Sequence, residues 1–140
     1  MARAVAAVVF PALLSAGVAL ADSPTDAQDV ITTLAAALAG DNVPLFFQPI
    51  DRAMPGYAKL RAQLEALTAR AQIASSIDFV ENEGDDARRT LLLDWYVEIQ
   101  SRGVSVSDKT ERRRKAVRCV VAKSGKSWRV VELDTADLFE

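Results

Sequence analysis

Three kinds of hydrophobic pattern follow one another along the 140 residues of the chain. Residues 4–20 form an almost unbroken apolar run, and residues 22–71 carry apolar side chains at intervals of three and four. From residue 72 onward, apolar and polar positions alternate. Intervals of three and four are typical of a helix with one buried face, whereas alternation is typical of a strand in a half-covered sheet. The order therefore predicts an apolar N-terminal segment, a helical first half and a strand-rich second half.

Two long helices with a short helical turn between them are predicted before residue 72. Ser23 and Pro24 suit the start of the first helix, because serine can cap a helix and proline fits the first helical position. The second long helix begins at Pro55-Gly56, and the short turn is the apolar segment 45–47. The apolar stripes consist of Val30, Ile31, Leu34 and Leu38 in the first helix and of Tyr57, Leu60, Leu64, Leu67 and Ala71 in the second.

The second half predicts four strands. A first strand ends at the acidic segment 81–86, and a turn at residues 124–126 separates the third strand from the fourth, at 128–133. Helices followed by such a meander predict an α+β fold, with N-terminal helices packed on one face of a curved antiparallel sheet of about four strands. The second strand has the clearest alternation, with Leu91, Leu93, Trp95, Val97 and Ile99 on one face.

Residues 1–21 have the layout of a secretory signal peptide. Arg3 is the only charge, an apolar run follows, and small residues ending in Ala21 precede Asp22. Pro11 and Gly17 interrupt the run, which is shorter than the roughly 20 residues that a membrane span needs. We expect cleavage between Ala21 and Asp22, a secreted or periplasmic location, and no stable membrane anchor afterwards. The alternative is an uncleaved anchor.

Residues 22–140 then form a single domain, long enough to bury a core of its own. The net charge of −2 becomes −3 without Arg3. In an exported acidic protein, the basic run 112–115 is better explained as a charged strand than as a nucleic-acid site. The only cysteine, Cys119, lies in the apolar run 117–121, which favours a buried thiol over the alternative of an intermolecular disulfide.

The order of these elements and two segments resemble a known superfamily. The segments are ITTLAAALAGDNVPLFF at 31–47 and KSGKSWRVVEL at 123–133. With the elements between them, they resemble the nuclear transport factor 2-like superfamily, which includes SnoaL-like proteins, from about Asp26 to Leu133. The resemblance implies a cone-shaped, cystatin-like α+β fold in which helices and a curved sheet enclose an apolar pocket. Superfamily members include isomerases, dehydratases, cyclases and non-catalytic binding domains, so the fold does not determine the function.

The composition excludes several kinds of catalytic site. The chain has no histidine, so it has neither a Ser–His nor a Cys–His nucleophile. A single cysteine cannot build a thiolate metal site, and no glycine-rich phosphate loop is present, so no metal and no cofactor is expected. What remains is proton transfer by a buried carboxylate with a tyrosine or a neutral acid beside it. Asp51 and Tyr57 are the candidates; the alternative for Asp51 is a solvated group that caps the second helix.

Two further groups of side chains are candidate site residues. Large side chains either line a ligand pocket or fill an ordinary core. Charged side chains of the second and third strands share one sheet face, which is either solvated or covered by a second subunit. The pocket candidates are Phe46, Phe47, Tyr57, Trp95, Val117 and Trp128, and the interface candidates are Asp94, Tyr96, Glu98, Arg114 and Arg118.

Together these patterns favour an exported, non-enzymatic module for ligand binding or protein interaction. We expect a homodimer that forms through the polar sheet face and a small apolar ligand in the cone. The alternative is a cofactor-independent isomerase or dehydratase that uses a buried carboxylate in an apolar pocket.

Overall fold

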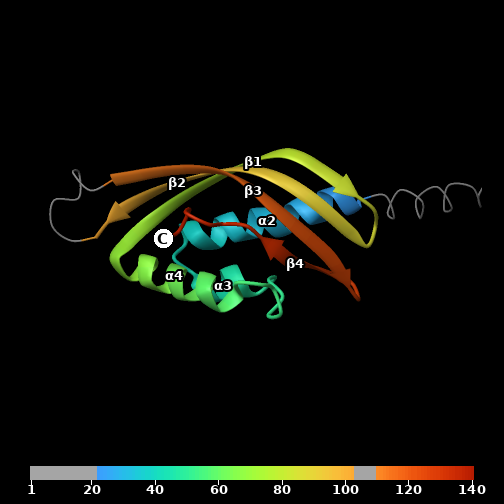
Figure 1. Cartoon of the computed structure of the whole chain (residues 1–140), viewed down its shortest axis with the longest axis horizontal. Helices are drawn as coiled ribbons and strands as arrows, with labels where there is room; N and C mark the ends of the chain where they lie inside the picture. Colours follow the sequence, from blue (N-terminus) through green and yellow to red (C-terminus); the bar gives the residue numbers. More distant parts are fainter. Residues whose placement is uncertain (1–21, 103–109) are drawn as a thin grey trace, which may run out of the picture.

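The computed structural model describes residues 22–102 and 110–140 as three helices packed against a four-stranded sheet (Figure 1). Residues 1–21, which hold the predicted signal peptide up to Ala21, lie outside the described residues, as do residues 103–109. The elements are α2 (Ser23–Ala39), α3 (Val43–Phe47), α4 (Tyr57–Arg70), β1 (Ala71–Gly84), β2 (Arg88–Ser101), β3 (Thr110–Ser124) and β4 (Ser127–Leu133).

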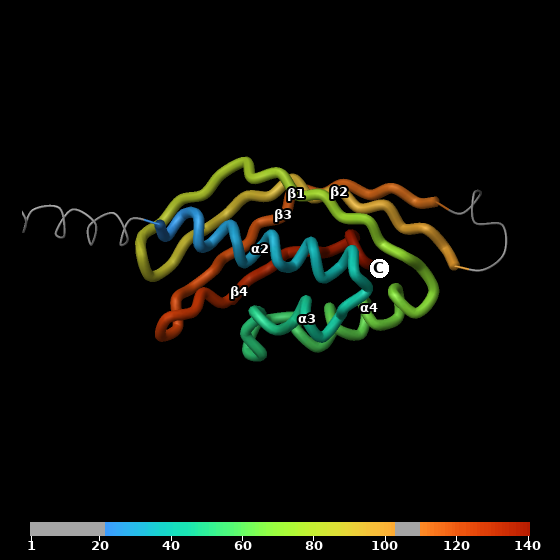
Figure 2. Tube along the Cα trace, turned by 180° about the vertical axis from the view of Figure 1, so that it is seen from behind, coloured from blue at the N-terminus to red at the C-terminus, as the bar shows by residue number. Residues whose placement is uncertain are grey.

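The four strands form an antiparallel meander in the order β1-β2-β3-β4. Trp95 in the middle of β2 pairs with Ile77 of β1 and with Lys115 of β3. The sheet is curved, and α2 runs along its concave side (Figure 1). In the reverse view, α2 lies between β1 and the other two helices, α3 and α4 (Figure 2). The short helix α3 contacts both long helices. The predicted α+β fold is confirmed.

The helices bury most of the stripes that the spacing predicts, but Ala71, predicted as the end of the second stripe, is instead the first residue of β1. Ile31, Leu34 and Leu38 of α2 are buried, as are Leu60, Leu64 and Leu67 of α4. The prediction that Ser23 caps the first helix is wrong. Ser23 is instead the first residue of α2, and its buried hydroxyl donates a hydrogen bond to Asp86 Oδ1 at 2.7 Å. This bond ties the start of α2 to the β1–β2 turn. None of the described helices is long and apolar enough to cross a membrane.

The core lies between the helices and the inner face of the sheet. The alternating residues of β2 from Leu91 to Ile99 are all buried, which confirms the predicted inner face. Cys119 is buried beside them, and burial raises the pKa of its thiol to about 12. An apolar interior cannot solvate a thiolate, so this cysteine is chemically inert in the folded protein.

The segment after β4 folds back into the core. Leu138 and Phe139 are each only 1% exposed, and the Phe139 ring meets Trp95 edge-on with 5.6 Å between ring centroids. Arg113 Nη1 donates a hydrogen bond to the Leu138 carbonyl at 3.0 Å. The sequence predicts only that residues 134–137 leave the sheet. The structure adds that the next two side chains fill the interior of the cone.

Candidate functional site

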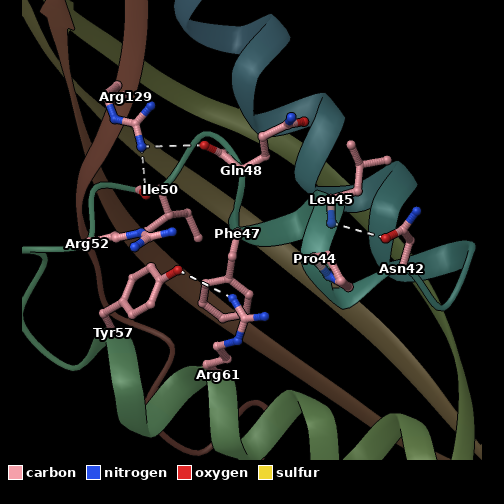
Figure 3. Close-up of a pocket in the computed structure, with 10 residues that line it drawn as sticks. All are labelled: Asn42, Pro44, Leu45, Phe47, Gln48, Ile50, Arg52, Tyr57, Arg61 and Arg129. Atoms are coloured by element: carbon pink, nitrogen blue, oxygen red, sulfur yellow. Dashed lines mark hydrogen bonds between the residues drawn. The ribbon is translucent and has the colours of Figure 1, made fainter.

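An open cleft of about 570 Å³ lies between α3, the loop that follows it, the first turn of α4 and β4 (Figure 3). Its volume falls within the range of about 300–1,000 Å³ that is usual for small-molecule sites. The apolar lining residues are Pro44, Leu45, Phe47, Ile50 and Tyr57, and the polar ones are Asn42, Gln48, Arg52, Arg61 and Arg129.

Two aromatic side chains form one wall of this cleft. Phe47 is the last residue of α3, and Tyr57 is the first residue of α4. Their rings meet edge-to-face with 5.1 Å between centroids, a favourable geometry for an aromatic pair. Asn42 fixes the start of α3, because its side-chain oxygen accepts a hydrogen bond from the Leu45 amide at 3.0 Å. The wall is therefore set by short-range structure at two helix termini.

The loop between α3 and α4 is attached to β4 through its backbone. The Val130 amide donates to the Pro49 carbonyl, and the Asp51 amide donates to the Val130 carbonyl, both at 2.9 Å. Arg129 Nη2 adds bonds to the carbonyls of Ile50 at 3.0 Å and Gln48 at 3.4 Å (Figure 3). Because these bonds join the loop to the sheet, the floor of the cleft has a defined shape in the absence of a ligand.

The cleft is positively charged in a chain whose net charge is negative. Arg52, Arg61 and Arg129 reach it from the loop, from α4 and from β4, whereas no aspartate or glutamate is among its lining residues. Arg61 stacks on Phe47, with its Cζ 5.4 Å from the ring centroid, and donates to the Tyr57 hydroxyl at 3.4 Å. Glu65 lies 3.8 Å from Arg61 Nε on the exposed surface of α4, where an ion pair contributes little.

Of the predicted pocket residues, Phe47 and Tyr57 line the cleft. Phe47 is nevertheless a core residue with 3% exposure, so Tyr57 presents more surface to the cleft. The other four candidates lie in the core and do not line the cleft: Phe46, Trp95, Val117 and Trp128. Phe46 and Trp95 pack near each other, with 6.5 Å between ring centroids, so that together with Phe139 they occupy the interior of the cone.

The two predicted catalytic residues, Asp51 and Tyr57, do not lie in one site. Tyr57 lines the cleft, but Asp51 does not. The Asp51 side chain turns back along its own loop, where Oδ1 accepts a hydrogen bond from the Ala53 amide at 2.8 Å. The carboxylate thus stabilises a turn before α4, which is close to the capping role given above as its alternative.

The predicted interface residues gather on the outer face of the sheet. Arg114 Nε donates to Asp94 Oδ1 at 2.9 Å, and the Tyr96 hydroxyl donates to Glu98 Oε1 at 2.8 Å. Hydrogen bonds from Arg114 lower the pKa of Asp94, and that from Tyr96 lowers the pKa of Glu98. Arg118 lies farther along β3, where Nη1 is 3.4 Å from Glu132 Oε2. These five side chains are thus paired within one chain, whereas Asp78, opposite Asp94 on the same face, forms no ion pair with a described residue.

Sequence reasoning missed the three arginines of the cleft. Arg52 and Arg61 are close in the sequence, but Arg129 is distant from both and reaches the site only because residues 49–51 lie beside β4, joined to it at Ile50 and Val130. No periodic pattern indicates a single-residue bridge between a loop and an edge strand. In residues 22–102 and 110–140, no group of three or more histidine, cysteine, aspartate or glutamate side chains could hold a metal ion.

No known family model and no curated protein matches the sequence. Solved structures do match. A conserved protein from Planctomyces limnophilus has a TM-score of 0.68 at 12% identity, over 78% of this chain and 91% of its own. A nuclear transport factor 2-like superfamily protein from Salmonella enterica serovar Typhimurium has a TM-score of 0.63 at 12% identity, over 79% and 87%. A type 2 hexachlorocyclohexane dehydrochlorinase has a TM-score of 0.61 at 8% identity, over 78% and 80%.

The chain has the nuclear transport factor 2-like fold, which confirms the resemblance found in the sequence. Proteins with this fold include both ligand-binding domains and enzymes. At 8–12% identity the likeness concerns the fold alone, so the activity of the dehydrochlorinase is a property of that protein.

Proposed function

We propose that the chain is a non-enzymatic binding module that holds a small molecule in the cleft between α3, α4 and β4. The observation that carries this proposal is the cleft itself: about 570 Å³, with an aromatic wall and converging polar groups. Aromatic and apolar lining with a few oriented polar side chains is typical of a small-molecule site.

The filled interior of the cone supports this location. An enclosed apolar pocket needs space between the helices and the sheet, but Phe46, Trp95 and Phe139 are packed there and are each at most 1% exposed. The outer cleft is therefore a better place for a ligand than the interior that the sequence suggests.

The alternative of an isomerase or dehydratase receives no support from the cleft. That chemistry needs a carboxylate next to a tyrosine in an apolar enclosure. Tyr57 is in place, but the Asp51 carboxylate accepts a bond from the Ala53 amide and does not line the cleft.

Native mass spectrometry of the purified protein tests the proposed function. Tyr57→Ala removes one wall of the cleft, and Tyr96→Ala makes the same change on the outer sheet face. We expect a small molecule that stays bound to the wild type and to Tyr96→Ala and is lost from Tyr57→Ala. The proposal fails if the wild type carries no small molecule, or if Tyr57→Ala carries the same one.

We also propose that two copies associate through the outer face of the sheet. Support comes from the ion pairs of Asp94 with Arg114 and of Glu98 with Arg112 within each chain, because covering a charge that is already paired leaves it with its partner. Arg114→Glu puts a like charge beside Asp94, and we expect light scattering to report a monomer for this variant and a dimer for the wild type. Lys126→Glu, in the exposed β3–β4 turn, is the control. An equal mass for Arg114→Glu and the wild type contradicts the interface.

Export is the remaining part of the proposal. It rests on the signal-like pattern of residues 1–21. Intact mass of the protein from its producing cells tests it directly, since we expect a chain that begins at Asp22. A chain that retains residues 1–21 contradicts the proposal.

A further inference from the structure

We infer that the ligand of the cleft is an aromatic carboxylic acid, bound as its anion with the ring against Tyr57. This inference rests on the proposed function, because it names the chemical class of the molecule that the cleft holds. It follows from the charge of the cleft, from the hydrogen-bond donors left over in it, and from the position of the aromatic wall.

The cleft carries an excess of positive charge. Three guanidinium groups line the cleft, and no carboxylate lines it. In the described part of the chain, neither Arg52 nor Arg129 forms an ion pair, and only Arg61 has an acidic neighbour, Glu65. Most other described arginines lie beside carboxylates, as Arg114 and Arg112 do, although the exposed Arg70 does not. A ligand anion therefore completes a site whose positive charge the protein leaves uncompensated.

The cleft has hydrogen-bond donors that the protein itself does not use. Arg129 uses Nη2 to hold the carbonyls of Gln48 and Ile50, which fixes its guanidinium plane and leaves Nε and Nη1 for another acceptor. The Tyr57 hydroxyl accepts from Arg61, so its own proton remains free to donate. Arginine and phenol donors suit a carboxylate, whose two oxygens accept several hydrogen bonds at once.

Tyr57 is the accessible part of the aromatic wall, because Phe47 behind it is only 3% exposed. Phe47 and Tyr57 form an edge-to-face pair at 5.1 Å, directly beside the Tyr57 hydroxyl and the Arg61 guanidinium (Figure 3). Leu45, which is 39% exposed, extends the apolar surface at the rim. A small inorganic anion does not contact this surface, whereas an aromatic acid covers it and reaches the arginines with the same molecule.

Three probes separate the contributions of ring and charge. Phenylacetate carries both, phenylacetamide carries the ring without the charge, and acetate carries the charge without the ring. Dissociation constants come from chemical-shift titrations of the labelled full-length protein at low salt. We expect phenylacetate to bind about tenfold more tightly than either of the other probes, as an ion-paired carboxylate and a stacked ring together require.

Arg52→Gln is the matching variant, because within the described residues its side chain makes no hydrogen bond that holds the fold. We expect this variant to bind phenylacetate about five- to tenfold more weakly and phenylacetamide unchanged. Lys126→Gln removes the same charge from the exposed β3–β4 turn and serves as the control, with wild-type affinity for all three probes.

The possible failures are distinguishable. Equal binding of phenylacetate and phenylacetamide overturns the inference about charge and leaves the proposed function standing. Equal binding of phenylacetate and acetate overturns the role of the ring. If phenylacetate does not bind while native mass spectrometry detects a Tyr57-dependent ligand, the class of ligand is wrong but the binding module is not. If neither experiment detects a ligand, both proposals fail.

Discussion

The C-terminal segment provides the sharpest test of how the interior is filled. Phe139 is 1% exposed and packs edge-on against Trp95. Transfer of a phenylalanine side chain back to water costs about 1.5–3 kcal/mol, and the aromatic pair adds about 0.5–1.5 kcal/mol. Phe139→Ala should therefore lower the free energy of unfolding by about 3 kcal/mol, which lies at the low end of the usual range for buried phenylalanine.

Urea denaturation, followed by far-UV circular dichroism, measures this loss. Leu45→Ala is the control: Leu45 is 39% exposed in α3, and we expect its truncation to cost less than about 1 kcal/mol. Near-UV circular dichroism of folded Phe139→Ala should also change, because Trp95 loses its edge-on neighbour. A loss below about 1 kcal/mol for Phe139→Ala would show that the segment does not fill the core in solution.

Three further predictions concern pH, the thiol and one glycine. The pKa of Asp94 is lowered in the folded state by Arg114, so its stabilising contribution is complete above the unfolded pKa of about 3.9 and is lost as the pH falls through the lower folded value. Because Asp94→Asn lacks this carboxylate, its urea midpoint should fall less than that of the wild type between about pH 6 and about pH 3. Equal falls for the two proteins would contradict a stabilising contribution from Asp94. Because the pKa of Cys119 is raised to about 12, iodoacetamide at about pH 8 should label the protein in urea but not when folded, as read by mass spectrometry; labelling at equal rates would show an accessible thiol. An added Cβ at Gly84, where φ is 143°, would lie 2.3 Å from the Arg88 carbonyl oxygen, so Gly84→Ala should cost more than about 2 kcal/mol in the same denaturation assay. Gly125→Ala, with φ of 63° and no atom within 4 Å, should cost only about 1 kcal/mol, and equal costs would refute the steric argument.

The elements could be predicted because their patterns are local. The alternation from Leu91 to Ile99 identifies a half-covered strand, and the stripe from Leu60 to Leu67 identifies a helix with one buried face. The same parity places Asp94 and Arg114 on one sheet face before any register is known, and the observed pairing of Tyr96 with Arg114 agrees with it. Local periodicity thus determines the layers and their faces.

The cleft could not be predicted because it depends on contacts between distant segments. Arg129 lies next to Val130, and only the backbone bonds of Val130 to Pro49 and Asp51 bring it to the loop after α3. The filling of the cone by Phe139 has the same origin, since two apolar residues after a polar turn form no periodic pattern. Residue type alone indicates Phe47 and Tyr57 as pocket candidates, but it does not indicate the three arginines that line the cleft with them.

The most direct test of the account is to locate bound phenylacetate by amide and arginine side-chain chemical shifts. The cleft predicts shifts at residues 42–48, at Arg52, Tyr57 and Arg61, and at Arg129, with the inner strand around Trp95 unchanged. Shifts centred on Trp95 and Phe139 would place the ligand inside the cone, and shifts confined to Asp94, Glu98 and Arg114 would place it on the outer sheet. Either result would contradict a binding site in the arginine-lined cleft.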